Sequence, residues 1–160
     1  MASAPRRRCG CRYPTCAAPG VGDPPTFRLD DCTTQRNLSA EGREQATRLG
    51  ARLTTRGVQI ARVLSSQWCR ALETARLAFG DRVEPEPALD SFFGTRELQQ
   101  NQTEIVRRLV AAWRGREGTL VLVTHQVNAT ALTGLSLGEG EVLVLAPKEA
   151  GFDLLGRIGG

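Results

Sequence analysis

The sequence predicts an α/β domain of three layers (α/β/α), in which helices cover both faces of a mainly parallel sheet. Strand and helix patterns alternate along most of the chain, as parallel pairing requires, because each crossover between parallel strands usually holds a helix. Residues Thr119-Leu-Val-Leu-Val-Thr124 are apolar on both faces, which is typical of a central parallel strand. The 160 residues suffice for one domain with a real core, and 41% apolar residues is a globular composition.

Residues 1–25 differ from the rest of the chain. Their sequence, MASAPRRRCGCRYPTCAAPGVGDPP, has no alternating or helical apolar pattern. We therefore expect residues 1–25 to be irregular or disordered and residues 26–160 to form the domain. Neither a core strand nor a long helix is therefore expected in residues 1–25.

The segment after Leu38 predicts the first long helix. Ser39 suits the N-cap and Glu41 suits the first turn. The buried side recurs at helical spacing through Gly42, Ala46, Leu49 and Leu53. Gly57 then ends the helix.

The next elements alternate strand and helix. Residues Val58–Leu64 are expected to form a short buried strand, and residues 68–79 a second helix. Residues Val83–Pro87 are a brief extended segment whose prolines favour a sheet edge. Residues 88–101 show no clear period and are expected to be a loop.

The last third predicts a helix over Glu104–Trp113, the strand Thr119–Thr124 and a helix at about 127–134. Residues Glu141–Ala146 and Gly151–Ile158 are expected to pair as a closing β-hairpin.

Composition excludes several classes of function. The net charge is only +4 and the arginines are scattered apart from Arg6–Arg8, so nucleic-acid binding is not expected. No apolar run reaches the ~20 residues that span a bilayer, and no apolar stretch follows the basic N-terminus, so neither a membrane span nor a signal peptide is expected. The chain as written is therefore expected in the cytoplasm. The cluster Cys9, Cys11 and Cys16 lacks a nearby histidine or second cysteine pair, so no metal is expected.

Polar clusters directly follow two predicted strands. They are Ser65-Ser-Gln-Trp-Cys-Arg70 and Thr124-His125-Gln126. Ligands of open parallel sheets bind beyond the carboxyl ends of the strands, and helix N-termini there favour anions. Arg70 and His125 together therefore indicate an anion site, although a structural histidine and a solvated arginine are equally ordinary interpretations of each residue alone.

Three segments resemble motifs of the histidine phosphatase (phosphoglycerate mutase-like) superfamily. Asn37-Leu-Ser-Ala-Glu-Gly-Arg-Glu-Gln-Ala46 is similar to its x-Leu-Thr/Ser-x-x-Gly-x-x-Gln-Ala helix start. Ser65-Ser-Gln-Trp-Cys-Arg-Ala-Leu-Glu-Thr-Ala75 resembles its Ser-Ser-x-x-x-Arg-Ala-x-x-Thr-Ala motif. Val123-Thr-His125, followed by Ala131-Leu-Thr-Gly134, resembles its second-histidine motif. The three motifs occur in the family's order, and the resemblance covers about residue 20 to the C-terminus.

The resemblance implies a phosphoglycerate mutase-like fold and hydrolysis of phosphomonoesters through a phosphohistidine, without a cofactor. Arg70 and His125 match the residues that bind the phosphate and stabilise its charge. The acid that protonates the leaving group would come from a variable loop, where Asp90 and Glu97 are candidates. The expected partner is a phosphorylated small molecule or a phosphoprotein.

One part of the family pattern is missing. The nucleophilic histidine of the family follows the first strand in an Arg-His-Gly-like motif, but the only histidine of this chain is His125. Tyr13 and Pro14 stand roughly where the nucleophile is expected. The interpretations are a phosphatase with impaired catalysis, a non-catalytic phospho-ligand binding or interaction domain, or a gene product with a wrong start or a frameshift at its 5′ end.

Cysteine does not replace the missing nucleophile, because no cysteine begins the Cys-x5-Arg signature of thiol phosphatases. A P-loop is also absent. Cys32 and Cys69 lie in loops of the resembling region, so a disulfide between them and two independent thiols both stay open. A disulfide would suit family members exported to the bacterial periplasm.

The resemblance implies an apolar first strand at the centre of the sheet, before the Arg-His motif, and this strand is expected to be absent as well. Its loss would leave backbone groups of its neighbours unpaired. We therefore expect a marginally stable, aggregation-prone protein. A sharp cooperative melt of a purified monomer would contradict this expectation.

Overall fold

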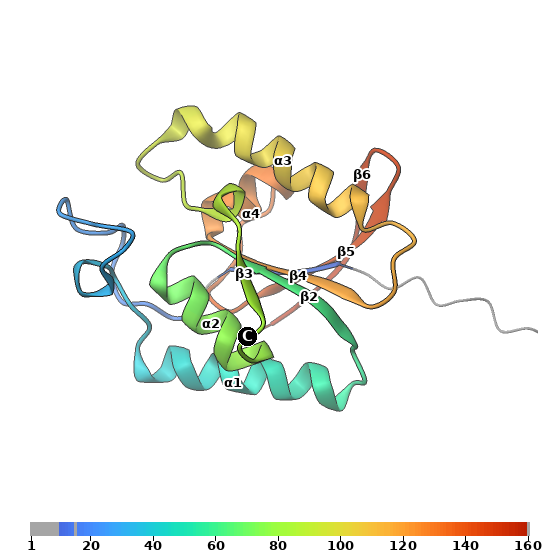
Figure 1. Cartoon of the computed structure of the whole chain (residues 1–160), viewed down its shortest axis with the longest axis horizontal. Coiled ribbons are helices and arrows are strands. Elements are labelled where there is room, and N and C mark those ends of the chain that lie inside the picture. The colour runs from blue at the N-terminus through green and yellow to red at the C-terminus, as the bar shows by residue number, and fades with distance from the viewer. Residues whose placement is uncertain (1–9, 15, 160) are drawn as a thin grey trace, which may run out of the picture.

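The computed structural model describes residues 10–14 and 16–159, in which six strands form one sheet with helices on both faces (Figure 1). The strands are β1 Gly10–Pro14, β2 Ile60–Ser65, β3 Val83–Pro85, β4 Thr119–Thr124, β5 Val142–Lys148 and β6 Gly151–Ile158. The α-helices are α1 Ala40–Thr55, α2 Cys69–Phe79, α3 Gln99–Ala112 and α4 Gln126–Thr133. Short 3-10 helices are η1 Cys32–Thr34, η2 Pro87–Leu89 and η3 Arg96–Leu98.

The sheet has the order β3-β2-β4-β1-β5-β6. The first four strands of this order pair in parallel, whereas β5 pairs antiparallel with both β1 and β6. The three-layer, mainly parallel α/β fold predicted from the sequence is therefore confirmed. β3 lies at the edge, where the prolines of its segment are tolerated.

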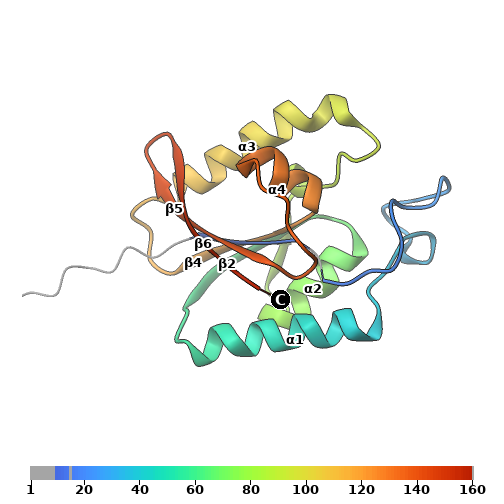
Figure 2. The same ribbon diagram turned by 180° about the vertical axis from the view of Figure 1, so that it is seen from behind.

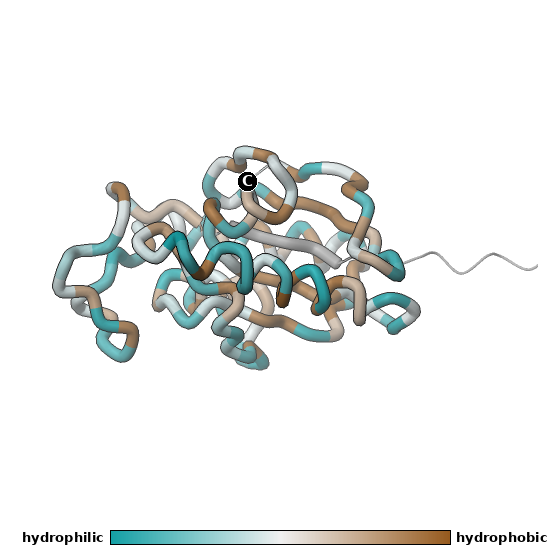
Figure 3. The backbone as a smooth tube through the Cα atoms, turned by 90° about the horizontal axis from the view of Figure 1, so that it is seen from above, coloured by the Kyte–Doolittle hydropathy of each residue, from teal (hydrophilic) through white to brown (hydrophobic). Residues whose placement is uncertain are grey.

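The two faces of the sheet carry separate apolar cores. Alternate residues of one strand point to opposite faces, so Leu120 and Leu122 of β4 pack under α3 and α4, while Val121 and Val123 pack against α1 and α2. In Figure 3, hydrophobic residues predominate in the inner segments of the domain, and hydrophilic residues lie in the outer loops and on the helix turns. All six residues of β4 are buried, which explains why its sequence shows no polar side.

The expectation that the first strand is absent is wrong. Gly10–Pro14 lies in the middle of the sheet, with Cys11 opposite Val121 of β4 on one side and Val144 of β5 on the other. Strand pairing uses backbone N–H and C=O groups, which do not depend on an apolar side-chain pattern. The sequence pattern of residues 10–14 therefore concealed a strand. The expected marginal stability assumed that no strand lies between β4 and β5. β1 occupies that place, so this assumption is wrong.

The loop expected over residues 88–101 is shorter and partly helical. It contains η2 and η3, and α3 begins at Gln99 rather than near Glu104. The first turn of α3 is Gln99-Gln-Asn-Gln, which is largely exposed and carries no apolar period that could have indicated a helix. Strand β2 likewise begins at Ile60, two residues later than expected. The hairpin of β5 and β6 is confirmed.

Residues 16–37 form an irregular segment that runs from β1 to α1 and projects beyond the body of the domain (Figures 1 and 2). The start of this segment contacts the start of α1. The Ala17 carbonyl accepts a hydrogen bond from the backbone N–H of Ser39, and Gly42 lies close to the same carbonyl. A Cβ at Gly42 would lie 2.2 Å from that carbonyl oxygen, so this contact requires glycine. Within the described residues, no helix is long and apolar enough to cross a membrane.

Candidate phosphate-binding site

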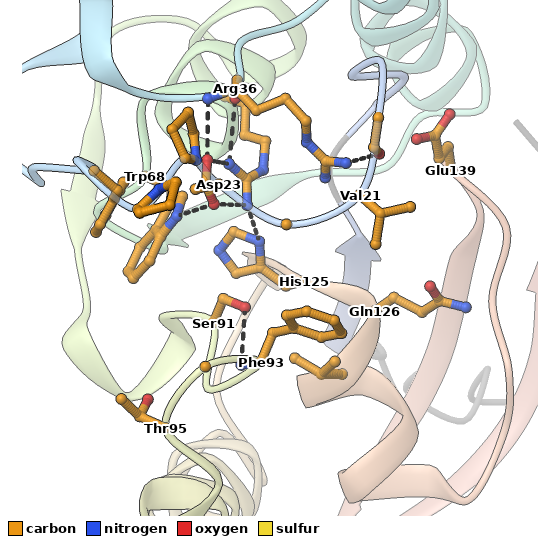
Figure 4. A pocket seen from close by; sticks show the side chains of 18 of the residues that line it. Val21, Asp23, Arg36, Trp68, Ser91, Phe93, Thr95, His125, Gln126 and Glu139 are labelled. Atoms are coloured by element: carbon orange, nitrogen blue, oxygen red, sulfur yellow. Dashed lines mark hydrogen bonds and ion pairs between the residues drawn. The ribbon is translucent and has the colours of Figure 1, made fainter.

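A pocket of about 630 Å³ lies at the carboxyl ends of the parallel strands. Its walls come from the segment after β1, the start of α2, the loop before η3, the start of α4 and the loop before β5. Figure 4 shows that the charged and aromatic side chains converge there. The position agrees with the rule that open α/β sheets bind ligands at this edge.

Arg70 is the second residue of α2 and is almost fully buried, with 3% of its surface exposed. Its two terminal nitrogens donate to the two carboxylate oxygens of Asp23, over 2.8 and 3.1 Å. One of them also donates to the Arg36 carbonyl at 3.2 Å. Burial lowers the pKa of Arg70, and Asp23 opposes this shift. The ion pair thus holds the guanidinium in one orientation.

Asp23 belongs to the irregular segment after β1, and the sequence analysis did not single it out. Besides Arg70, its carboxylate accepts hydrogen bonds from the Trp68 indole at 3.0 Å and from the backbone N–H of Arg36 at 3.0 Å. Burial raises its pKa, but the hydrogen bonds from Arg70, Arg36 and Trp68 outweigh it and lower the pKa below the ordinary value. The Asp23 carboxylate therefore holds Arg70, Trp68 and the backbone of Arg36 together. In the sequence, only the turn-forming run Gly-Asp-Pro marks this residue.

Arg36 is the second cation of the pocket and was also missed by the sequence analysis. Its side chain reaches back to donate to the Gly20 carbonyl and lines the pocket. Among the described residues, neither the Nε of Arg36 nor the Nε of Arg70 has a hydrogen-bond partner, although both atoms are buried. A buried donor without an acceptor costs about 1–3 kcal/mol, so a site with two such guanidinium donors favours an anion.

His125 follows β4 directly and is 5% exposed. Its Nε2 lies 2.8 Å from Ser66 Oγ and its Nδ1 lies 3.4 Å from an Arg70 terminal nitrogen. Burial, supported by the positive charge of Arg70, lowers the pKa of His125 to about 3. The imidazole is therefore neutral at physiological pH. Arg70 and His125, which the sequence analysis selected together, are in direct contact (Figure 4).

The two candidate acids occupy different places. Asp90 follows η2 and is half-buried; its Oδ1 accepts hydrogen bonds from Ser66 Oγ at 3.0 Å and from the backbone N–H of Gln67 at 2.7 Å. Burial raises the pKa of Asp90. Glu97 lies in η3 and is exposed. The pocket wall beside Asp90 is formed by Ser91, Phe93, Gly94 and Thr95.

A disulfide joins Cys32 to Cys69, so the pairing that the sequence left open is present. It connects η1 to the first residue of α2, next to Arg70. Gln35 supports the same connection by accepting a hydrogen bond from the backbone N–H of Cys69 at 2.9 Å, and Phe27 stacks on Trp68 with ring centroids 4.9 Å apart. The projecting segment that carries Asp23 and Arg36 is thereby fixed against the start of α2.

The end of β1 lies beside His125. Pro14 pairs with Thr124, the last residue of β4, so the end of β1 lies next to the strand end that carries His125. Pro14 is not a histidine, and His125 is the only histidine of the sequence. Thr15, Cys9 and the Arg6–Arg8 cluster lie outside the described residues. Cys16 is fully buried, and burial raises its pKa to about 11, so its thiol stays protonated.

In the described part of the chain, no group of three His, Cys, Asp or Glu side chains is placed to hold a metal ion. The site instead combines two guanidinium groups, one carboxylate and a neutral imidazole. Such groups bind and polarise a phosphoryl group without a metal.

The fold is the phosphoglycerate mutase-like α/β fold of several solved phosphatases. The chain is similar to phosphoserine phosphatase from Entamoeba histolytica in complex with 3-phosphoglyceric acid (TM-score 0.72, 13% identity, covering 96% of this chain and 98% of that one). It is also similar to the ecdysone phosphate phosphatase from Bombix mori in complex with tungstate (TM-score 0.73, 13% identity, 94% and 92% covered). A third similar structure is the protein histidine phosphatase SixA with tungstate (TM-score 0.61, 14% identity, 94% and 96% covered).

A family match agrees with the fold. Residues 32–94 match the histidine phosphatase superfamily (branch 1), and they include α1, β2 and the start of α2 with Arg70. No curated protein matches the chain. The matched segment agrees with the resemblance that the sequence motifs indicate, and the solved structures share the fold of the chain.

Proposed function

We propose that this protein binds the phosphoryl group of a phosphomonoester in the pocket between Arg70, Arg36 and His125. The observation that carries the proposal is the pair of buried guanidinium Nε atoms for which the described residues provide no acceptor. A phosphate offers oxygen acceptors that satisfy such donors, and arginine suits it because the planar guanidinium can donate two parallel hydrogen bonds.

The charged side chains that meet next to His125 favour an anion, whereas Glu139, from another wall, brings the lining of the whole pocket to zero net charge. Arg70 and Arg36 are positive and Asp23 is negative, while His125 is neutral, so these four side chains carry one net positive charge. Asp23 accepts hydrogen bonds from both terminal nitrogens of Arg70, and we assign it the role of orienting the guanidinium. Glu139 lies at the wall of the pocket formed by the loop before β5.

Hydrolysis through a phosphohistidine is impaired in this proposal. The end of β1 lies beside the end of β4 but carries no histidine, so the nucleophile of the family has no counterpart there. Binding needs the groups after β2 and β4, whereas turnover also needs the group after β1. The protein is therefore a phospho-ligand binding member of a phosphatase family.

The ligand beyond its phosphate is proposed to have an apolar portion. Val21, Phe93, Val127 and Leu137 line the pocket, and Val21 and Phe93 are exposed there. Apolar surface at a binding site favours a ligand that covers it. Phosphorylated small molecules and phosphoproteins both occur among ligands of this kind, and the phosphatases of similar fold are named for either.

The test is calorimetric titration of the oxidised protein with inorganic phosphate and with phenyl phosphate, together with a p-nitrophenyl phosphate hydrolysis assay. We expect binding that Arg70→Ala and Arg36→Ala each weaken about tenfold or more, because a charged hydrogen bond contributes about 1.5–3 kcal/mol. Arg76→Ala, an exposed arginine of the same helix, serves as the matched control.

Two results would overturn the proposal. Absence of phosphate binding by the folded wild type would remove the binding role. Hydrolysis of p-nitrophenyl phosphate that disappears in Arg70→Ala would show that the pocket turns over substrate with another nucleophile. Arg36 is only half-buried, so its variant keeps the test valid if Arg70→Ala does not fold.

A further inference from the structure

The segment 16–37 carries two charged groups of the pocket but has almost no core of its own. Between residues 19 and 37 the only buried side chain is that of Gln35, and most of the others are exposed. The segment also projects beyond the body of the domain (Figures 1 and 2). A segment with few buried contacts opens at a low cost in free energy. Its position at the pocket therefore depends on a small number of specific contacts.

These contacts converge on the start of α2. The non-covalent ones are an ion pair, a hydrogen bond to a backbone N–H and an aromatic stack, formed by Asp23 with Arg70, Gln35 with Cys69, and Phe27 with Trp68. The covalent contact is the disulfide between Cys32 and Cys69. A disulfide restricts the two chain segments that it joins, whatever the state of the weaker contacts around it.

The disulfide lies beside both guanidinium groups of the site. Cys69 directly precedes Arg70 in α2, and Cys32 precedes Arg36 in the segment 16–37. The backbone of Arg36 contacts the same place, because its N–H donates to Asp23 at 3.0 Å and its carbonyl accepts from Arg70 at 3.2 Å. The disulfide therefore fixes the guanidinium that the segment carries relative to the one that α2 carries.

The disulfide is open to attack from solvent, because Cys32 is exposed and Cys69 is half-buried. A thiolate that attacks Cys32 Sγ forms a new S–S bond to it and releases Cys69 as a thiolate. Cys69 is the first residue of α2, and the partial positive charge of a helix N-terminus stabilises a thiolate and makes it a better leaving group.

A dithiol completes the exchange. Its second thiol displaces Cys32, so that the dithiol becomes a disulfide and two electrons and two protons pass to the protein as two cysteine thiols.

We infer that the Cys32–Cys69 disulfide is a redox switch of the phosphate site: the oxidised protein holds Arg36 at the pocket, and reduction by a dithiol releases the segment 16–37 and weakens phosphate binding. This inference rests on the proposed phosphate site. In the reduced protein only the non-covalent contacts hold the segment against α2, so Arg36 spends part of the time away from the pocket. The affinity for phosphate then falls about tenfold, which is the contribution of one charged hydrogen bond.

The primary test is calorimetric titration with inorganic phosphate of the oxidised protein and of the protein reduced by dithiothreitol. We expect the reduced protein to bind about tenfold more weakly. The variant Cys32→Ser/Cys69→Ser should bind as weakly as the reduced wild type and should not respond to the reductant. Cys16→Ala is the matched control, because Cys16 is a buried free thiol, and this variant should keep the full response.

A second pair of variants tests whether the switch acts through Arg36. Arg36→Ala lacks the group that reduction displaces, so its phosphate affinity should be the same in both redox states. The exposed Arg76→Ala should keep the tenfold response. A tenfold response that survives in Arg36→Ala would overturn the inference.

Amide hydrogen exchange of the free protein gives a readout without a ligand. Reduction should speed the exchange of the Arg36 amide, which donates to Asp23, and leave the amides of β4 unchanged. Equal exchange of the Arg36 amide in both redox states would contradict the release of the segment.

The reduction potential tests the same coupling from the other side and shows whether the reduced protein keeps its site. By linkage, phosphate must favour the disulfide by the factor by which the disulfide favours phosphate. A tenfold factor corresponds to about 30 mV for this two-electron couple. We expect added phosphate to lower the potential until the shift levels off at about 30 mV. A shift that grows without limit would mean that the reduced protein has lost the site altogether, and would overturn a switch between two folded states.

The titrations separate this inference from the proposed function. Equal phosphate affinity in the oxidised and reduced proteins would overturn the switch and leave the phosphate site intact. Absence of binding in both redox states would overturn the site itself, and the switch with it. A backbone amide spectrum of each sample establishes that it is folded.

Discussion

The carboxyl ends of β1 and β4 lie side by side at the pocket, yet they supply different chemistry. The end of β4 carries His125, which is buried, neutral and tied to Arg70 and Ser66. The end of β1 carries Pro14 and then a segment whose contribution is Asp23, a carboxylate held on Arg70. In the proposed function, the end of β4 therefore serves phosphate binding, whereas the end of β1 supplies no histidine that could attack the phosphorus.

The largest expected effect comes from breaking the link between these two regions. Arg70→Ala leaves Asp23 without its counter-charge, and loss of one partner of a buried pair costs about 3–5 kcal/mol. The Asp23 side chain retains 14% exposure, so we expect the lower end of this range. Urea unfolding followed by fluorescence measures it, and a loss below about 1 kcal/mol would show that the pair does not join the regions.

Reduction of the Cys32–Cys69 disulfide tests a second connection between the segment after β1 and the start of α2. Cys32 and Cys69 are 37 residues apart, and a loop of this size corresponds to about 2–4 kcal/mol. We expect reductant to lower the unfolding free energy of the wild type by this amount. The double variant Cys32→Ala/Cys69→Ala should be less stable without reductant and insensitive to it; a wild type that ignores reductant would contradict the expectation.

The pH dependence of the unfolding free energy tests the protonation state of His125 at the end of β4. Since the pKa of His125 is about 3 in the folded protein and about 6.5 in the unfolded chain, the unfolded state binds one more proton between these values. Stability must therefore fall as the pH falls, by about 2 kcal/mol between pH 7 and pH 5. His125→Gln should be flatter over this range. Equal slopes for both proteins would mean that the imidazole is protonated when folded.

The smallest expected effect lies where the segment after β1 meets α1. Ser39 caps α1 by accepting from the backbone N–H of Gly42 at 3.0 Å, and its hydroxyl lies 3.3 Å from the Ala17 carbonyl. Ser39→Ala should cost about 1 kcal/mol. Thermal unfolding compares it with Ser39→Asp, which retains the cap. If both variants lose the same stability, the contact with Ala17 matters more than the cap.

Elements with a regular apolar period were predictable from the sequence. β4 has the predicted bounds, because each of its residues is buried. β1 was not predictable, since its place depends on backbone pairing with strands from the far end of the chain. The start of α3 was missed because a polar, solvent-facing turn has no apolar period.

The residues of the site also differ in whether the sequence could predict them. Arg70 and His125 follow predicted strands and resemble family motifs, so the sequence was sufficient to select them. Asp23 and Arg36 come from an irregular segment, and their contacts depend on how that segment folds back over α2. Asp90 was selected as an acid, but its contact with Ser66 is visible only in three dimensions.

The position of β1 has a consequence for the nascent chain. Cys11 leaves the ribosome long before its partners Val121 and Val144, which lie more than a hundred residues further along the chain. At about 5–20 residues per second, the first strand waits on the order of ten seconds before both neighbours exist. During this time β2 and α2 can form beside an incomplete sheet. Completion of the sheet, and with it of the pocket, is therefore a late step of folding, and chaperones have most opportunity to bind before it.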